Sequence, residues 1–525
     1  MTARDVAGVE PPAQRAGHPR PTPRPRTGPV PGADEPTVVL PPHDADRPTV
    51  ELPPAVGGSA ASDEVPGGGG VAGSESPTVV LGVVAPAITS DEPGTTPGRK
   101  KSGAGEGLAL SVSSALGSLA GFLSWLLAAR IMPQEEVGRA SAVVSAFILI
   151  GGCAQLNINV GLLRWLPGSG RKAPRLVWGS LFLIMPLSAL VGLVYVLIVP
   201  DLGATASGLL SPDDGSIGVG VLLFVLACAG WAVFVVHDFI LVAMHRPWWT
   251  VWRNGLFAVA RIGLLVALGA GLGAQGLVVS WVLPIVVWTV GGTLVIALLV
   301  RRFARRAEGS VLPSRREAVS FLGPTAVAQI GSALLYNQVT LLVTLRFGPG
   351  PGAAFFIVWQ AVSVVDIAAT FYMDSLAVQT AREPLRAAAL ARAAQRRMMV
   401  LFLPVLAIAI MLAQPVLLVF GPGYAEASRI LQILMIGLVF RLVVVHELGV
   451  RQAAGAALAF SRLQLVNTLL VLAVVAVLPT PPVGSTTDSA LLPIALGYLA
   501  VQVLSAAAVL VPPALRRRLR PEVKR

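Results

Sequence analysis

The sequence predicts an all-α, polytopic membrane protein with about twelve transmembrane helices in two six-helix bundles, both termini inside and a disordered N-terminal tail. Of the 525 residues, 54% are hydrophobic, and the mean hydropathy is +0.72. After residue 105, apolar stretches alternate with short polar gaps. Each stretch has roughly 20 residues, which is enough to cross about 30 Å of hydrocarbon.

The Lys and Arg residues predict the topology, because they fall almost entirely into every second gap. The segments on one side hold 28 of them, whereas the gaps on the other side hold 4, namely Arg130, Arg139, Arg346 and Arg429. Cations retained beside membrane spans mark the cytoplasmic side. We therefore expect both termini to be cytoplasmic. The Ala-, Gly-, Pro- and Arg-rich composition is typical of a high-GC bacterial genome, which makes a bacterial cytoplasmic membrane the expected location.

The expected helices follow the apolar stretches in order. They cover residues 107–130, 140–163, 176–199, 217–243, 251–273, 276–300, 319–346, 352–378, 398–420, 424–446, 460–479 and 488–512. An even number of spans agrees with two termini on the same side of the membrane.

Composition divides the chain into five parts. We expect a Pro/Gly/Thr-rich cytoplasmic tail (1–105), a first bundle (106–300), a basic cytoplasmic linker (301–318), a second bundle (319–512) and a basic C-terminal tail (513–525). A short internal match supports the two halves: Arg130-Ile-Met-Pro133 and Arg346-Phe-Gly-Pro349 each follow the first helix of a half. Repeated halves of this kind are common in transporters.

The N-terminal tail contains a threefold repeat. Thr37, Thr49 and Thr78 each follow a proline, with a leucine three residues later and acidic residues nearby. One interpretation makes them sites for a Ser/Thr kinase, because such phosphothreonines resemble ligands of forkhead-associated domains. The other is sequence drift in a segment that buries too little apolar surface to fold.

Several classes of function are excluded by the sequence. The net charge of +12 arises in the membrane region, since residues 1–104 carry 9 cations and 12 anions, so we expect no nucleic-acid partner. The match to GxGxxG at Gly271–Gly276 follows an apolar helix and not a strand, which rejects a dinucleotide site. The five histidines show no metal-ligand spacing, and no P-loop is present. We expect no enzyme, metal or cofactor, and leave H⁺ or Na⁺ coupling open.

Polar side chains inside the apolar stretches are the candidates for a functional site. A charge at the centre of a membrane costs about 2.5–3.5 kcal/mol on insertion scales and marks a cavity or a partner. Candidates for contact with a substrate are Arg261, Arg441, Arg164, Asn337 and Gln338, and candidates for ion coupling are Asp366 and Asp238. Arg261 lies about 12 Å deeper than Arg253, at 1.5 Å per residue.

Two interpretations of these residues stay open. In one, they tie helices together, for example Asp238 with Arg261 on consecutive antiparallel helices. In the other, a central cation meets an anionic substrate while a carboxylate couples to an ion. Arg164 lies at the inner end of its helix, where it either contacts a headgroup or anchors the helix.

Three segments resemble one protein family. They are Leu126-Leu-Ala-Ala-Arg-Ile-Met-Pro-Gln-Glu-Glu-Val-Gly138, Gly161-Leu-Leu-Arg-Trp-Leu-Pro167 and Val419-Phe-Gly-Pro-Gly-Tyr-Ala-Glu-Ala427. In this order they resemble bacterial polysaccharide-biosynthesis flippases of the multidrug/oligosaccharidyl-lipid/polysaccharide (MOP) exporter superfamily, over roughly residues 107–512.

The resemblance implies two six-helix bundles with alternating access. It also implies that a lipid-linked, pyrophosphate-bearing oligosaccharide or polysaccharide precursor moves from the inner to the outer leaflet, with membrane lipids around the protein. Three alternatives stay open: a multidrug/cation antiporter of the same superfamily, a lipid II flippase, and a non-transporting membrane scaffold with a phosphorylated tail. A lipid II flippase usually has two further helices, which this sequence does not show.

Overall fold

The computed structural model describes residues 117–210, 217–306, 310–482 and 484–511. These residues form helices and turns and contain no strand. The elements after a first helix, Gly117–Ile131, are α2 (Gln134–Ala154), α3 (Ile158–Trp165), η1 (Gly170–Lys172), α4 (Ala173–Ile198), α5 (Pro200–Leu210), α6 (Ile217–Ala243), α7 (Pro247–Arg306), α8 (Arg315–Ala333), η2 (Leu334–Gln338), α9 (Val339–Phe347), α10 (Pro349–Arg382), η3 (Pro384–Arg386), α11 (Ala387–Met411), α12 (Ala413–Leu418), α13 (Pro422–Ala425), α14 (Ser428–Ala453), α15 (Ala457–Val477) and α16 (Thr487–Leu510). The tail with Thr37, Thr49 and Thr78 lies outside these residues.

The predicted all-α membrane fold is confirmed. Ten of the helices in the described ranges are long and apolar enough to cross a membrane. One of them, α7, contains two antiparallel arms joined at Gly273, whose φ of 53° and ψ of −131° are not helical. Counting both arms and the shorter Gly117–Ile131 helix reproduces the twelve expected segments. Gly273 suits this turn because a positive φ is strained for side chains with a Cβ.

Prolines mark where several of these helices begin. Pro133 precedes α2, while Pro247, Pro349 and Pro422 are the first residues of α7, α10 and α13. A proline at the first helical position has the required φ and lacks only an N–H that would have no intrahelical acceptor. The turns at both ends of the bundle are therefore encoded locally.

Several of the expected boundaries are wrong: the helix expected over 398–420 is interrupted at Leu412, and the one expected over 424–446 runs from Ser428 to Ala453. The stretch expected as one helix over 140–163 is divided at Gln155–Asn157, where Leu156 and Asn157 have positive φ values of 47° and 59°. The helix expected from 398 begins at Ala387, because the Arg-rich segment before it also folds into α11. Alanine is the commonest residue of this segment, and alanine and arginine are both good helix formers.

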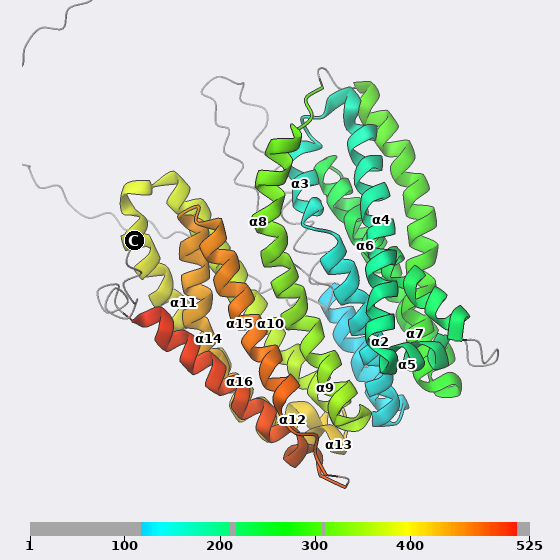
Figure 1. Ribbon diagram of the computed structural model, residues 1–525, viewed down its shortest axis with the longest axis vertical. Coiled ribbons are helices and arrows are strands. Elements are labelled where there is room, and N and C mark those ends of the chain that lie inside the picture. The colour runs from blue at the N-terminus through cyan, green and yellow to red at the C-terminus, as the bar shows by residue number, and fades with distance from the viewer. Residues whose placement is uncertain (1–116, 211–216, 307–309, 483, 512–525) are drawn as a thin grey trace, which may run out of the picture. The chain divides into compact units, whose positions relative to one another are not determined.

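The Lys/Arg-rich segments 164–175, 301–306 and 310–316 lie at one end of the helices, where the Val311 amide donates to the Gly168 carbonyl. We call this the basic end, and the end with the turns at Met132 and Gly348 the opposite end. Between them, α8 runs beside α2 and α3 (Figure 1). Helix α8 also packs against α15, so it contacts helices of both halves.

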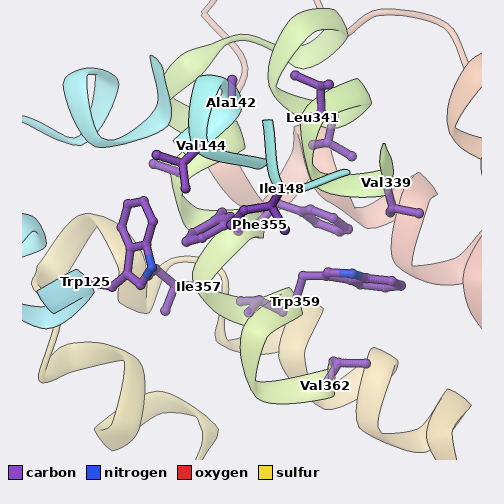
Figure 2. Packing of buried hydrophobic residues seen from close by; sticks show 14 of the residues in the cluster. Trp125, Ala142, Val144, Ile148, Val339, Leu341, Phe355, Ile357, Trp359 and Val362 are labelled. Atoms are coloured by element: carbon purple, nitrogen blue, oxygen red, sulfur yellow. The ribbon is translucent and has the colours of Figure 1, made fainter. Parts of the chain in front are cut away.

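The apolar core continues from one half into the other. Figure 2 shows Val144 and Ile148 of α2 beside Phe355 of α10, with Trp125 near Ile357. The Trp125 and Phe356 rings are 4.5 Å apart in an edge-to-face arrangement. Because side chains of both halves share one cluster, the two halves are packed together at this level.

The opposite end is closed by contacts between the two halves. Arg130 Nε donates to the Val419 carbonyl at 2.7 Å, and Gln134 Nε2 donates to the Gly350 carbonyl at 2.8 Å. At Gly138 the backbones come so close that an added Cβ would collide with the Pro349 carbonyl. Residues from all three of these contacts belong to, or follow directly after, the repeated and family-like motifs of the sequence.

We predict that Gly138→Ala lowers the free energy of unfolding by about 1–3 kcal/mol, the usual cost of overpacking. The added methyl group would push α2 away from the Pro349 backbone. Gly179→Ala is the matched control, since its Cβ would meet open space, and it should stabilise α4 by up to about 1 kcal/mol. Denaturation in detergent measures both, and equal midpoints for the two variants would contradict the close contact.

Candidate functional site

A cavity of about 190 Å³ lies among α8, α10, α14 and α15 and includes Asn157 from the break between α2 and α3. Its wall reaches from Arg441, Tyr336 and Gln464 to Gly455, in the turn between α14 and α15. That turn follows Arg451 at the basic end. The cavity therefore extends toward the basic end, while the opposite end is closed.

An ion pair between α10 and α14 lies at the deep side of this cavity. Arg441 Nε is 3.0 Å from Asp366 Oδ1, and its Nη2 is 3.4 Å from Asp366 Oδ2. Both residues are buried, with exposed fractions of 2% and 3%. The Tyr336 hydroxyl donates a further hydrogen bond to Asp366 at 2.9 Å. Each charge is therefore matched by its partner inside the membrane region.

Amide side chains complete the coordination of Arg441. Its Nη1 donates to Asn467 Oδ1 at 2.8 Å, and its Nη2 lies 3.4 Å from Gln464 Oε1. Asn467 in turn donates to Ser505 of α16. All three guanidinium nitrogens thus have acceptors, which supports the interpretation of Arg441 and Asp366 as a tie between helices. A satisfied buried network of this kind holds its helices in one arrangement.

A second ion pair joins the buried Arg253 to the half-buried Asp238. Asp238 Oδ1 is 2.6 Å from Arg253 Nη2, and Asn254 donates to Oδ2 at 3.2 Å. Arg253 also lies over the Phe234 ring at 4.0 Å. The alternative that paired Asp238 with Arg261 is therefore wrong. In the antiparallel α6–α7 pair, Asp238 and Arg253 lie at similar distances from the turn at His245, whereas Arg261 is two turns deeper.

Arg261 differs from the other buried arginines. It occupies the middle of the first arm of α7 and is 2% exposed. Its guanidinium lies over the Trp281 ring at 4.4 Å and near the Phe257 ring at 5.7 Å. Among the described residues, no carboxylate pairs with it, and its Nε has no hydrogen-bond partner. Aromatic stacking offsets part of its desolvation but supplies no counter-charge.

The break between α2 and α3 faces an irregular segment of the second half. Gln329 of α8 donates to the Gly152 carbonyl at 2.9 Å, just before the break. Shortly after Gln329, η2 is a single π-helical segment. Such segments interrupt regular helices and are frequent at functional sites. The two irregular backbones come together where α2 packs against α8 and η2.

The remaining predicted residues occupy separate places. Arg164 is exposed at the end of α3 and lies over the Phe321 ring of α8 at 4.8 Å. Asn337 is buried and donates to the Ala333 carbonyl of the preceding turn. Gln338 accepts a 2.6 Å hydrogen bond from the Tyr195 hydroxyl of α4. Arg164 and Gln338 therefore connect the two halves, while Asn337 contacts its own helix.

Several residues of the site, among them Arg253, Tyr336, Gln464 and Asn467, were not among the sequence candidates. Arg253 is one of the 28 Lys and Arg residues that the sequence assigns to the cytoplasmic side, yet it is buried in α7. Asp238 and Arg253 lie almost equally far from the turn at His245, on either side of it. This spacing is the feature of the sequence that predicts the pair. Tyr336 and Asn467 join the Arg441 network through tertiary contacts. No local pattern in the sequence points to them.

Comparison with known proteins identifies the fold. No family model matches the chain, and the search of curated proteins finds no match. Among solved structures, the inward-facing conformation of a multidrug resistance MATE family transporter of the MOP superfamily superimposes with a TM-score of 0.55 at 14% identity, covering 79% of this chain and 100% of that one. The chain has the MATE fold.

The outward-facing conformation of a MATE family transporter of the same superfamily is also similar. It has a TM-score of 0.51 at 14% identity and covers 78% of this chain and 94% of that one. Similarity at this level is a similarity of fold. It places α2 to α7 and α8 to α16 in the arrangement of a MATE-like protein, in agreement with the two bundles expected from the sequence.

We predict that Arg441→Met lowers the free energy of unfolding by about 3–5 kcal/mol, because it leaves the buried Asp366 carboxylate without its counter-charge. The double variant Asp366→Leu/Arg441→Met should recover most of this loss. Arg261→Met is the matched control, since it removes a buried arginine without leaving an unpaired carboxylate. Chemical denaturation in detergent measures all three. Equal losses for Arg441→Met and Arg261→Met would contradict this account of the pair.

Proposed function

We propose that this protein is a membrane transporter that flips a lipid-linked, pyrophosphate-bearing saccharide from the inner to the outer leaflet of a bacterial cytoplasmic membrane. The observation that carries the proposal is Arg261, a buried guanidinium whose counter-charge is not supplied by the described residues. A phosphate group would supply that charge, and a guanidinium matches its geometry with two parallel hydrogen bonds.

Alternating access is supported by the distribution of contacts along the helices. The cavity extends to the basic end, which the positive-inside rule makes cytoplasmic. The opposite end is closed by Arg130 and Gln134, which bond to backbone carbonyls of the other half. A substrate head would therefore enter from the cytoplasmic side. Because Arg261 is buried and does not line this cavity, relative movement of the helices would first uncover it for the head, and release outside would then require the contacts at the opposite end to break.

Export of cationic drugs is the second candidate, because the fold is that of multidrug resistance MATE transporters. A cationic substrate needs a carboxylate that is free to bind it. In the described residues, however, Asp366 and Asp238 are each bound to an arginine. Among the described residues, the buried charge that lacks a counter-charge is the positive one of Arg261, and it favours an anionic substrate.

The coupling of transport to H⁺ or Na⁺ is a further part of the proposal. Asp366 is the better candidate, because its arginine partner lines the cavity and its ion pair joins α10 to α14. Binding of a cation to Asp366 would weaken that tie and release the two helices. The partners proposed for Thr37, Thr49 and Thr78, a Ser/Thr kinase and a forkhead-associated domain, would act through the tail and separately from transport.

We predict that Arg261→Met reduces the flipping rate about 10- to 100-fold. This factor corresponds to the loss of one or two charge-assisted hydrogen bonds to the substrate. A leaflet-accessibility assay with lipid-linked oligosaccharide in proteoliposomes measures the rate. Arg261→Lys should retain part of the activity, because the charge stays. Arg429→Ala, which removes an exposed cation at the opposite end, is the control. Wild-type flipping by Arg261→Met would exclude Arg261 from substrate binding.

We predict that deletion of residues 1–100 leaves flipping in the same assay unchanged within about twofold, because the helical region contains the whole transport path. A scaffold that acts through its tail would instead lose its role, seen as loss of surface polysaccharide in cells despite normal flipping in vesicles. Loss of flipping in proteoliposomes after the deletion would contradict the proposed division between tail and transporter.

A further inference from the structure

A second cavity, of about 730 Å³, lies in the first half and is separate from the polar cavity. Three helix faces form it: α6, the first arm of α7 and the second arm of α7. On the first arm the lining residues recur at helical spacing, from Trp248 through Trp252 to Val259, and on the second arm Trp288, Gly292 and Val295 do the same. We call this cavity the tryptophan groove.

The tryptophan groove opens to the side of the helices. Trp252 is 78% exposed and Val259 is 68% exposed, although both belong to membrane-spanning segments. From Trp248 to Val259 the groove extends about 16 Å along the helix, which is about half of a hydrocarbon core of about 30 Å. It therefore runs from the basic end to nearly the depth of Arg261, within one leaflet.

The deep wall of the groove contains two polar groups that are already bound. Arg253 is paired with Asp238, and the His237 ring lies 3.3 Å from the Thr293 hydroxyl. All other lining residues are apolar, aromatic or glycine. The groove therefore suits a hydrocarbon chain and not a sugar or a charged head.

Apolar surface alone does not explain selective binding here, because the surrounding lipid tails are as apolar as the groove. Selectivity must come from shape and from charge. Four tryptophans form rigid, flat walls with large contact areas, and Gly255 on the first arm places no side chain between them, while Gly292 on the second arm faces the His237 ring. Such a slot fits a methyl-branched chain better than the surrounding straight ones.

Charge at the mouth of the groove selects the lipid head. Arg246 lies two residues before Trp248, and Arg301 and Arg302 end the apolar part of the second arm, all three exposed at the basic end. Cations at a membrane surface attract anionic headgroups at about 1 kcal/mol each. An anionic lipid whose chain lies in the groove would have its phosphate beside these residues.

We propose that the tryptophan groove binds the branched hydrocarbon chain of the phosphate-bearing lipid substrate in the inner leaflet, before its head enters the protein. The inference rests on the proposed function and assigns the lipid part of that substrate to the α6–α7 face. The chain then stays in the groove or the bilayer while the head reaches Arg261, which lies on the same arm of α7.

The test is photolabelling of the full-length protein in liposomes. The probe is a polyprenyl phosphate with a diazirine in its chain, compared with the uncharged polyprenol and with a phospholipid that carries a diazirine on an acyl chain. At equal mole fractions we expect about tenfold more labelling of the peptides around Trp252 and Trp288 by the polyprenyl phosphate, a ratio equivalent to one decade of affinity. Equal labelling by the phospholipid would show a groove filled by bulk lipid and would overturn the proposal.

Variants that fill the groove sharpen the test. Val295→Trp and Val259→Trp should each reduce specific labelling about tenfold, and Val259 is so exposed that its replacement leaves the core intact. Leu294→Trp, beside Val295 but outside the groove and 64% exposed, is the matched control. Unchanged labelling in both groove variants would refute the site. Labelled protein that flips no substrate would refute the proposed function alone, whereas flipping without labelling would refute the groove alone.

Discussion

A charge inside a bilayer must find its counter-charge within the protein or its substrate, because hydrocarbon offers no water to replace it. This constraint explains the arrangement of the charged residues in the membrane region. Arg441 and Asp366 hold α10 to α14, and Arg253 and Asp238 hold α6 to α7. Arg441 also donates to an amide oxygen and Arg253 to a backbone oxygen. Arg261 is the exception among these buried charges, which makes it informative about the substrate.

The contacts between the halves are polar and few at the opposite end and apolar in the middle. Arg130 and Gln134 use side chains to reach backbone carbonyls of the other half. Single hydrogen bonds of this kind contribute about 0.5–1.5 kcal/mol each, so the closed end can open at modest cost. Two of the three family-like segments, 126–138 and 419–427, contribute residues to these contacts, whereas Gly161–Pro167 lies at the basic end.

The first half combines two surfaces with different chemistry. Its interior face has Arg261 among aromatic rings, and its lateral face has the tryptophan groove. Both are formed by the two arms of α7, which turn back on each other at Gly273. A movement of one arm relative to the other would change both surfaces together. The geometry of α7 thus connects the place proposed for the lipid chain with the place proposed for the phosphate.

The sequence by itself determined the twelve segments, the side on which each turn lies and the positions where prolines begin helices, because hydropathy, Lys/Arg placement and proline act locally. The sequence could also have predicted the Asp238–Arg253 pair, because two residues equally far from a tight turn between antiparallel helices lie at the same depth. Only the tertiary structure decided that Asp366, 75 residues before Arg441, is its partner, that α2 ends at Ala154 against α8, and that Arg261 stays unpaired among the described residues. These features depend on which helix faces meet, and in helices that are apolar almost throughout, hydropathy does not distinguish one face from another.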